Sequence, residues 1–494
     1  MKAKKTVRHL RLTKAAGAVL ALALAGCVHV PADTSAATAP DFARAQHEAA
    51  LKLARDAWPA QQWWKEYGDA QLDDLVARAL TNSPSIAVAQ ARVATARAAL
   101  RAEEAAGGAQ VGLNAGLNRQ RYSATGLFPE PIGGNWFNDS TVQVKASYDF
   151  DWWGRHRALV AAALGETSAR QAEAAQAAQT LSAAVAQSYF RLQMLWARER
   201  NVAAQQAVQR DVLSGRQQRL KQGLVNIDTV QGAEQDLASL NQQAQYFATQ
   251  AAREREALRA LIGADSDGLP GLSFRPPQEV QAALPARLGI ELLARRPDLQ
   301  AARWRVEAAL GRTRAAEAAF YPDLNLMAAA GLNSVSLSRL LQYGSRTMLA
   351  GAALNLPIFD AGRLEAGLGE ARAQRDELLA DYNQSVLVAV RDVAEEAATL
   401  AGIAQQRRAY QEAVDKAASL EANARVRLKA GLAESAAVLQ AQLATLRLRD
   451  AGLQLRDAEL QSQVALVKAL GGGYRAAPIQ TAANNQQDNH AIAK

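Results

Sequence analysis

The chain of 494 residues contains one cysteine, Cys27, and only five histidines. A single cysteine excludes an intramolecular disulfide, and the histidines are too scattered in the sequence for a histidine-based zinc site. The sequence also has no Walker-type glycine loop and no Gly-x-Ser-x-Gly nucleophile motif. We therefore expect no catalytic residue, no metal site and no cofactor, and we do not expect an enzyme.

Aromatic residues are scarce as well, at 5% of the chain, which argues against a large all-β core. Alanine dominates the apolar residues and is accompanied by Leu, Gln, Arg and Glu, a composition that favours helices. Six of the eight net positive charges belong to the first 26 residues, so the remaining chain carries only +2. This near balance gives no reason to expect a nucleic-acid partner.

The N-terminus resembles a bacterial lipoprotein signal peptide. A basic segment precedes an apolar run over 15–24, which is too short to cross a bilayer as a helix. The run ends in Leu24-Ala25-Gly26-Cys27, which is similar to the box in which the cysteine is acylated and the chain is cut before it. We expect Cys27 to carry a lipid anchor, and Val28 in place of Asp favours the outer membrane. An ordinary secretion signal is the alternative.

Proline is missing from two long stretches, 132–269 and 358–477. Since proline breaks helix interiors, very long helices fit there. Motifs also recur in the same order in both halves of the chain. Asn82-Ser83-Pro84 is followed 213 positions later by Arg295-Arg296-Pro297, and the sequence from Arg219 to Leu224 returns 208 positions later from Arg427 to Leu432. We interpret this series as an internal duplication.

These patterns predict that each half consists of a helix, two strands, a very long helix, a glycine turn and a second long helix. In the first half we expect helices over 72–106, 155–219 and 227–261, with strands over 109–122 and 139–153. The predicted segments are a signal peptide (1–26), a lipidated tether (27–70), a first repeat (71–263), a linker (264–287), a second repeat (288–473) and a disordered tail (474–494).

The expected strands alternate apolar and polar residues. Over 142–152 the even positions are apolar or aromatic, from Val142 to Trp152, and the odd positions are polar. One apolar face and one polar face are typical of a transmembrane barrel with a water-filled interior, although a half-buried sheet in a soluble domain is the alternative. Four strands cannot close a membrane barrel, so several chains must contribute, and three chains would supply twelve strands.

The last expected helix carries two apolar seams. Leucine or valine recurs every seven residues from Leu439 to Val467, and alanine does so from Ala437 to Ala465. The offset between the seams corresponds to about 200° around the helix. Two opposed seams predict two neighbours, as in the wall of a helical cylinder, with a buried bundle helix as the alternative.

Taken together, these features resemble the TolC-like outer membrane factors, and most closely their NodT-type lipoprotein branch. The resemblance covers nearly the whole mature chain and rests on Trp63-Trp64, Leu72-Asp73-Asp74-Leu75, the segment from Tyr148 to Arg155, Arg295-Arg296-Pro297-Asp298, Phe320-Tyr321-Pro322, the segment from Asn355 to Gly362, and the segment from Lys468 to Gly473. It implies a mixed α and β membrane protein: a homotrimer whose twelve-stranded outer-membrane β-barrel continues into a long periplasmic α-helical barrel.

The same resemblance implies a passive exit duct for drugs or other small solutes. Its implied partners are a periplasmic adaptor, outer membrane lipid and an inner-membrane pump of the resistance–nodulation–division (RND) type, which would supply the energy. A channel for type I protein secretion or metal efflux is the alternative within this fold. A periplasmic coiled-coil adaptor or structural rod is the alternative from another class.

The resemblance also implies roles for the two glycine turns. Gly223, Leu224, Gly431 and Leu432 match the hairpin tips that face the adaptor in that family. Asp228 and Glu434 follow these turns, where acidic residues often form the closed periplasmic aperture. Relatives often carry Asp at the positions of Ala437 and Gln440, so a strong acidic ring is in doubt here. Helix capping and favourable interaction with the helix dipole are the alternative roles for Asp228 and Glu434.

Overall fold

A computed structural model describes residues 30–35, 47–48, 57–265, 268–269, 271–285, 287–288 and 290–475. The predicted signal peptide, Cys27 and residues 476–494 of the predicted tail lie outside the described residues. The chain divides into two compact units. Unit 1 comprises Met1–Ala39, Val93–Ala169 and Ala302–Tyr382, and unit 2 comprises Pro40–Arg92, Arg170–Ala301 and Asn383–Lys494.

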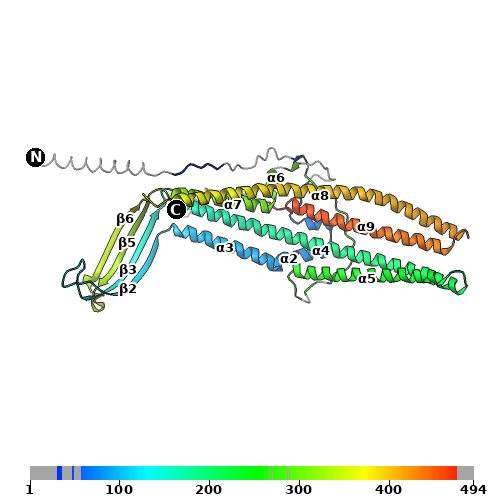
Figure 1. Cartoon of the computed structure of the whole chain (residues 1–494), viewed down its shortest axis with the longest axis horizontal. Coiled ribbons are helices and arrows are strands. Elements are labelled where there is room, and N and C mark those ends of the chain that lie inside the picture. Colours follow the sequence, from blue (N-terminus) through cyan, green and yellow to red (C-terminus); the bar gives the residue numbers. More distant parts are fainter. Residues whose placement is uncertain are drawn as a thin grey trace, which may run out of the picture. The chain divides into compact units, whose positions relative to one another are not determined.

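Unit 1 contains a four-stranded antiparallel sheet with two strands from each half of the chain (Figure 1). The strands are β2 (Gln110–Arg121), β3 (Trp136–Phe150), β5 (Asp323–Ser334) and β6 (Arg346–Asn355). Their order is β2-β3-β5-β6, so β2 and β6 are the edge strands of this sheet. The expectation of two strands per half is confirmed.

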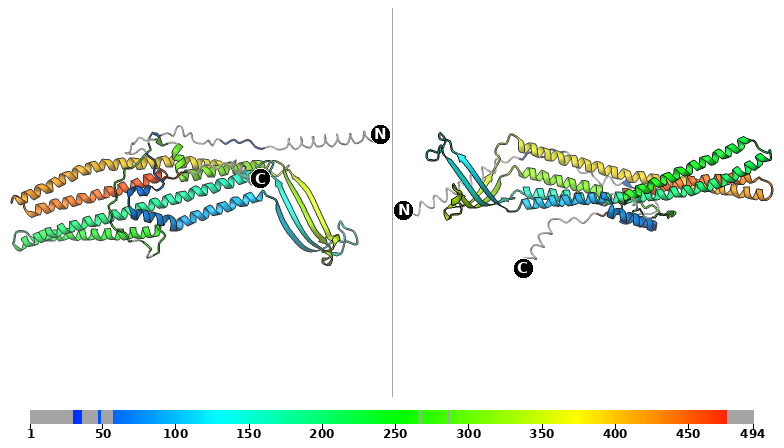
Figure 2. Two further views of the ribbon diagram at one scale, coloured as in Figure 1. Left: turned by 180° about the vertical axis from the view of Figure 1, so that it is seen from behind. Right: turned by 90° about the horizontal axis from the view of Figure 1, so that it is seen from below.

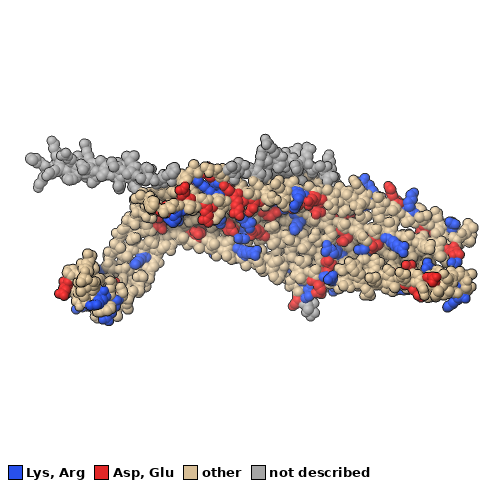
Figure 3. Space-filling model, viewed as in Figure 1, with Lys and Arg blue, Asp and Glu red and all other residues tan. Residues whose placement is uncertain are grey.

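The register of the sheet separates an apolar face from a polar one. Leu113 pairs with Val144, Val144 with Ala330, and Ala330 with Met348, and directly paired residues lie on the same face. The other face carries Asn114 opposite Gln143, which is followed in the same row by Gly331 and Thr347. The alternation predicted over 142–152 is correct along β3, whereas Met327 on β5 and Leu349 on β6 are apolar side chains on the otherwise polar face. Charged side chains are sparse over the strands on the face seen in Figure 3.

The apolar face of the sheet is largely uncovered by the chain itself. The exposed fraction is 72% for Leu113, 47% for Val144 and 83% for Met348. A row of apolar side chains left open on three of the four strands requires either lipid or another apolar partner.

Two of the four helices in unit 1, α4 (Arg155–Lys221) and α7 (Pro297–Ala318), pack very close to each other. The four are the first part of α4, most of α7, the end of α3 (Pro84–Ala106) and the start of α8 (Arg363–Lys429). A Cβ atom added at Gly165 would lie 2.9 Å from the backbone nitrogen of Ala308, and one at Gly311 would lie 2.9 Å from the carbonyl oxygen of Ala158. Glycine at both positions therefore allows α4 and α7 to approach backbone to backbone.

Unit 2 contains two long helix hairpins (Figure 2). Helix α4 turns back into α5 (Ile227–Leu261), and α8 turns back into α9 (Ser435–Ala469). The hydroxyl of Ser188 donates to Glu254 at 2.7 Å in the first hairpin, and that of Ser462 donates to Glu396 at 2.6 Å in the second. These pairs occupy equivalent positions of the two halves with donor and acceptor exchanged, which supports the predicted duplication.

The core of unit 2 begins within the predicted tether. A 3₁₀ helix, η1 (Trp63–Tyr67), buries both tryptophans and the tyrosine against α4 and α2 (Ala70–Asn82). The hydroxyl of Tyr189 donates to Asp69 at 2.5 Å, and Asp69 also accepts from the backbone of Gln71 and so caps α2. The segment 27–70 thus includes residues that belong to the folded core.

The helix expected over 72–106 is interrupted. Ser83 is extended, with φ −65° and ψ 129°, and separates α2 from α3. Pro84 is the cause, because a residue that precedes proline is disfavoured in the helical region. In the part of the chain that the structure describes, no helix has an apolar stretch long enough to span a membrane. The remaining short elements are β1 (His47–Glu48), β4 (Arg287–Leu288), α6 (Ile290–Arg295), η2 (Leu337–Arg339) and η3 (Tyr343–Ser345).

Candidate functional site at the helix-hairpin turns

The two hairpins of unit 2 end in turns of the same construction. Gly223 and Gly431 adopt left-handed backbone conformations, with φ of 72° and 71°. The backbone amide of Leu224 donates to the carbonyl oxygen of Arg219 at 2.9 Å, and that of Leu432 donates to the carbonyl oxygen of Arg427 at 2.8 Å. These bonds complete the hydrogen bonding of a Schellman motif. Each turn therefore needs glycine at one position.

Each turn also presents a leucine to solvent. The exposed fraction is 67% for Leu224 and 71% for Leu432. The Schellman motif fixes the backbone at these two leucines, so each turn presents an apolar side chain at a defined position, where the predicted contact with a partner protein could form.

Asp228 lies in the first turn of α5 and does not cap that helix. Asn226 is the capping residue, since its side-chain oxygen accepts from the amide of Thr229 at 3.2 Å. The side-chain nitrogen of Asn226 donates to the Asp228 carboxylate at 3.2 Å. Asp228 thus lies beside the positive end of the helix dipole, which accounts for an acidic residue at this position.

Glu434 occupies the N-cap position of α9 but makes no capping hydrogen bond with its side chain. Its carboxylate instead lies 2.6 Å from the guanidinium of Arg219, at the end of α4. The side chains are 65% and 39% exposed, so this ion pair contributes only about 0–1 kcal/mol. It joins the two hairpins next to their turns.

Between the ends of the two hairpins lies a groove of about 1210 Å³. Its charged lining residues are Asp211, Arg216, Arg219, Arg427 and Glu434, so three guanidinium groups face two carboxylates. Ala437 and Gln440 also line the groove. The walls of this groove are thus not predominantly acidic, and Glu434 lies in it whereas Asp228 is not among its lining residues.

Farther from the turns, the hairpins are connected by a second, more buried ion pair. Arg198 on α4 binds both carboxylate oxygens of Asp450 on α9, at 2.9 and 3.0 Å. The side chains are only 22% and 13% exposed, and the guanidinium lies 4.4 Å from the centre of the Phe247 ring. This bidentate contact holds α4, α5 and α9 together more firmly than the pair at the turns.

Sequence reasoning identified the turns and both acids but missed Arg219, Arg198 and Asn226. Asn226 has a recognisable signal, because an Asn just before an apolar residue is a common N-cap. The arginines have no local signal, because their partners lie more than 200 positions away. Among the residues described by the structure, no group of three or more His, Cys, Asp or Glu side chains is placed to hold a metal ion.

Comparison with known proteins identifies the class of this fold. A model of the family described as outer membrane efflux protein matches residues 75–264 and 288–472. The chain is 35% identical to the multidrug resistance outer membrane protein MdtP of Escherichia coli K12 over 87% of this chain and 90% of the relative. It is also 35% identical to MdtQ of Escherichia coli O157:H7, over 92% and 97%.

Solved structures agree with this assignment. The outer membrane protein VceC of Vibrio cholerae is 31% identical, with a TM-score of 0.77 over 85% of this chain and all of that one. The CmeC outer membrane channel of Campylobacter jejuni has a TM-score of 0.80 over 94% of this chain and 98% of that one, at 19% identity. The fold is therefore that of an outer-membrane channel subunit. The chain belongs to the outer membrane efflux protein family, as the sequence resemblance predicted, and its location is the outer membrane.

Proposed function

We propose that three copies of this chain form the outer-membrane exit duct of a tripartite efflux system. Drugs or other small solutes pass through it passively, and an inner-membrane pump supplies the energy. The observation that carries this proposal is the four-stranded sheet of unit 1, which has two open edges, one apolar face and one polar face.

The sheet is suited to closure by copies of itself. An open edge cannot persist in lipid, because its backbone groups would lack hydrogen-bond partners. All three strand pairs are antiparallel, so β2 of one copy continues the alternation when it pairs with β6 of the next. Three copies give twelve strands, within the range of closed membrane barrels. The apolar face then meets lipid, and the polar face lines a wet interior.

The last helix, α9, supports the same assembly. Along its leucine seam, Leu460 is fully buried within the chain, and Leu439, Leu446 and Leu453 are half-buried. Along its alanine seam, Ala437, Ala444, Ala451 and Ala458 are exposed. One seam is thus occupied inside the chain, whereas the other is free for a neighbouring copy, and alanine permits close approach of that neighbour.

The hairpin turns are the proposed contact with the periplasmic adaptor. Leu224 and Leu432 are exposed, and the groove between the turns contains both charge signs. A pump of the RND type completes the proposed assembly. Acylation of Cys27 adds a second attachment to the outer membrane.

Electrophoresis and electrical recording test this proposal. The purified protein should migrate as a trimer in detergent and convert to monomers on heating. Reconstituted into a planar bilayer, it should show single-channel conductance. Monomers that carry no current in bilayers would contradict the proposal and would favour a periplasmic rod.

A further inference from the structure

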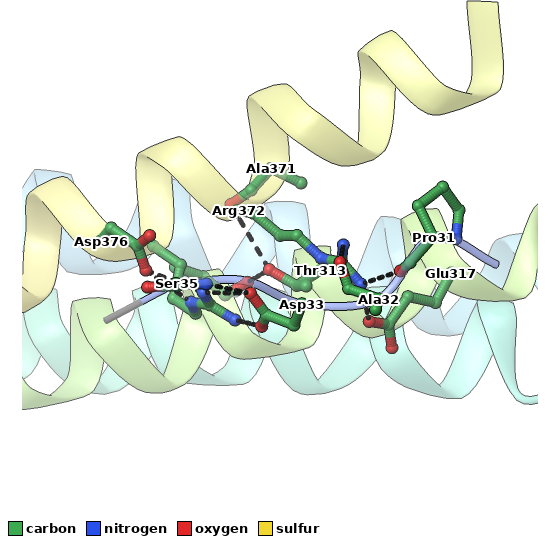
Figure 4. Close-up of polar contacts among 11 residues, drawn as sticks. Pro31, Ala32, Asp33, Ser35, Thr313, Glu317, Ala371, Arg372 and Asp376 are labelled. Carbon is green, nitrogen blue, oxygen red and sulfur yellow. Dashed lines mark hydrogen bonds and ion pairs between the residues drawn. The ribbon is translucent and has the colours of Figure 1, made fainter. Parts of the chain in front are cut away.

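The segment that follows the proposed lipid attachment site is bound to the helices of unit 1 (Figure 4). Arg372 on α8 donates to the carbonyl oxygens of Pro31 and Ala32 at 2.8 and 2.9 Å. Arg375, one turn along the same helix, forms an ion pair of 2.5 Å with Asp33. Two arginines thus hold three consecutive residues of the N-terminal segment.

Each arginine also contacts a carboxylate outside the segment. The Arg372 guanidinium also contacts Glu317 on α7 at 3.3 Å, and that of Arg375 contacts Asp376 at 2.8 Å. The side chains of Arg372 and Arg375 are only 15% and 14% exposed. A planar guanidinium held in this way presents two parallel donors, a geometry that lysine lacks. Hydrogen bonding to Arg375 accordingly lowers the pKa of Asp33 to about 2.

A groove of about 690 Å³ lies at the start of the bound segment. Its lining includes Val30, Trp153 and Tyr321, together with the cationic side chains Arg157 and Arg314. The rings of Trp153 and Tyr321 stack at 4.5 Å between centroids, and the indole nitrogen donates to the carbonyl of Pro322 at 2.9 Å. Aromatic side chains with one polar edge are characteristic of the boundary between lipid and water.

The length of the intervening chain places the lipid near this groove. Cys27 precedes Val30 by three residues, and three residues span at most about 10 Å. An unbound tether over 27–56 would instead spread over an r.m.s. distance of about 30 Å. Binding of Pro31, Ala32 and Asp33 therefore confines the lipid attachment point to the surroundings of the groove.

We propose that Arg372 and Arg375 form a docking site for the chain's own N-terminal segment, and that the groove beside Trp153 and Tyr321 seats acylated Cys27. The inference rests on the proposed acylation. The docking site fixes where the acyl chains leave the protein, next to the ends of β3 and β5. The aromatic rings pack against the acyl chains, and Arg157 and Arg314 lie beside the polar linkage between the lipid and the cysteine.

Chemical cross-linking tests the docking site. A chain carrying Val30→Cys and Ala161→Cys has two new thiols that both line the groove. A short bismaleimide should join them in the otherwise unchanged protein. Arg372→Ala combined with Arg375→Ala should reduce the yield at least tenfold. Arg391→Ala removes an exposed, carboxylate-paired arginine from the same helix and should leave the yield unchanged.

Either of two results would overturn the docking site: no cross-link in the parent protein, or the same yield after both arginines are removed. Assembly of the trimer is measured in each variant, so that loss of the cross-link is not confused with loss of folding. Cross-linking of the two new thiols does not require the acyl chain, and peptide mapping distinguishes it from a cross-link through an unacylated Cys27.

A photoactivatable palmitate tests the seat of the lipid. After incorporation at Cys27 and irradiation, its cross-links should map to α4 and to the segment around Tyr321, and they should scatter in the variant lacking both arginines. Cross-links confined to other surfaces would refute the seat. A chain that takes up no label at all would refute acylation itself, while the thiol cross-link would still report whether the arginines hold the segment.

Discussion

The carboxylate of Glu434 lies 2.6 Å from the guanidinium of Arg219, so an ion pair joins the two hairpins beside their turns. Both side chains are partly exposed, and such pairs contribute little to stability. A weak contact suits the proposed aperture, because the proposed adaptor would then need only a small difference in affinity between the closed and dilated states to shift the equilibrium. The stronger ion pair between Arg198 and Asp450 lies farther from the turns and is better suited to keep α4 and α9 together when the turns separate.

Breaking the contact at the turns should ease opening. We predict that Glu434→Ala, alone or together with Asp228→Ala, raises single-channel conductance or lowers the preference for cations, as measured in planar bilayers. Three arginines already line the groove. The change in conductance or cation preference should therefore be smaller than the change caused by removing a complete acidic ring. Arg219→Ala should raise conductance as well, because it breaks the same pair from the other side.

Asp228→Ala alone is the matched comparison. Asp228 contacts Asn226 on its own helix, so its removal should change conductance less than that of Glu434. If conductance and ion selectivity are unchanged when both acids are replaced, neither residue belongs to the aperture, and their roles are confined to the starts of α5 and α9.

Acylation of Cys27 is tested by metabolic labelling. Radioactive palmitate should enter the protein with Cys27 and should not enter Cys27→Ala, because the thiol is the acceptor. Insertion of the sheet should survive the substitution, since the strands are a separate membrane anchor. Equal labelling of both proteins would mean that the box from Leu24 to Cys27 is part of an ordinary secretion signal.

The two faces of β3 should respond oppositely to charge. Val144 lies on the apolar face, so Val144→Arg should cost about 2–4 kcal/mol per chain if the side chain lies near the middle of the bilayer. Ser147 lies on the other face, and Ser147→Arg should assemble normally. Yield of heat-modifiable trimer in the outer membrane is the measurement. Normal assembly of Val144→Arg with failure of Ser147→Arg would invert the assignment of faces.

The sequence predicted those parts of the fold that depend on local patterns. The bounds of α5 at 227 and 261 were predicted correctly, because a glycine turn precedes its start. The faces of the strands follow from their period of two, which pairing preserves across the sheet. The contacts of Arg219, Arg198 and Arg372 could not be predicted, because each depends on how segments far apart in the sequence pack.

Asp457 on α9 should make stability depend on pH. Burial raises the pKa of its carboxyl, opposed by a hydrogen bond from Gln461 and by the charges of Arg191 and Arg198. Compared with the unfolded state, the native state therefore favours the protonated carboxyl. The resulting stabilisation is present below the ordinary aspartate pKa of 3.8 and is lost as the pH rises through the higher native pKa.

We predict that Asp457→Asn raises the temperature of trimer dissociation at pH 7 and that the difference between variant and parent vanishes in acid. In the control Asp450→Asn, loss of the Arg198 contact should cost about 1.5–3 kcal/mol. An unchanged dissociation temperature for Asp457→Asn at both pH values would show that burial of this carboxyl has no energetic cost.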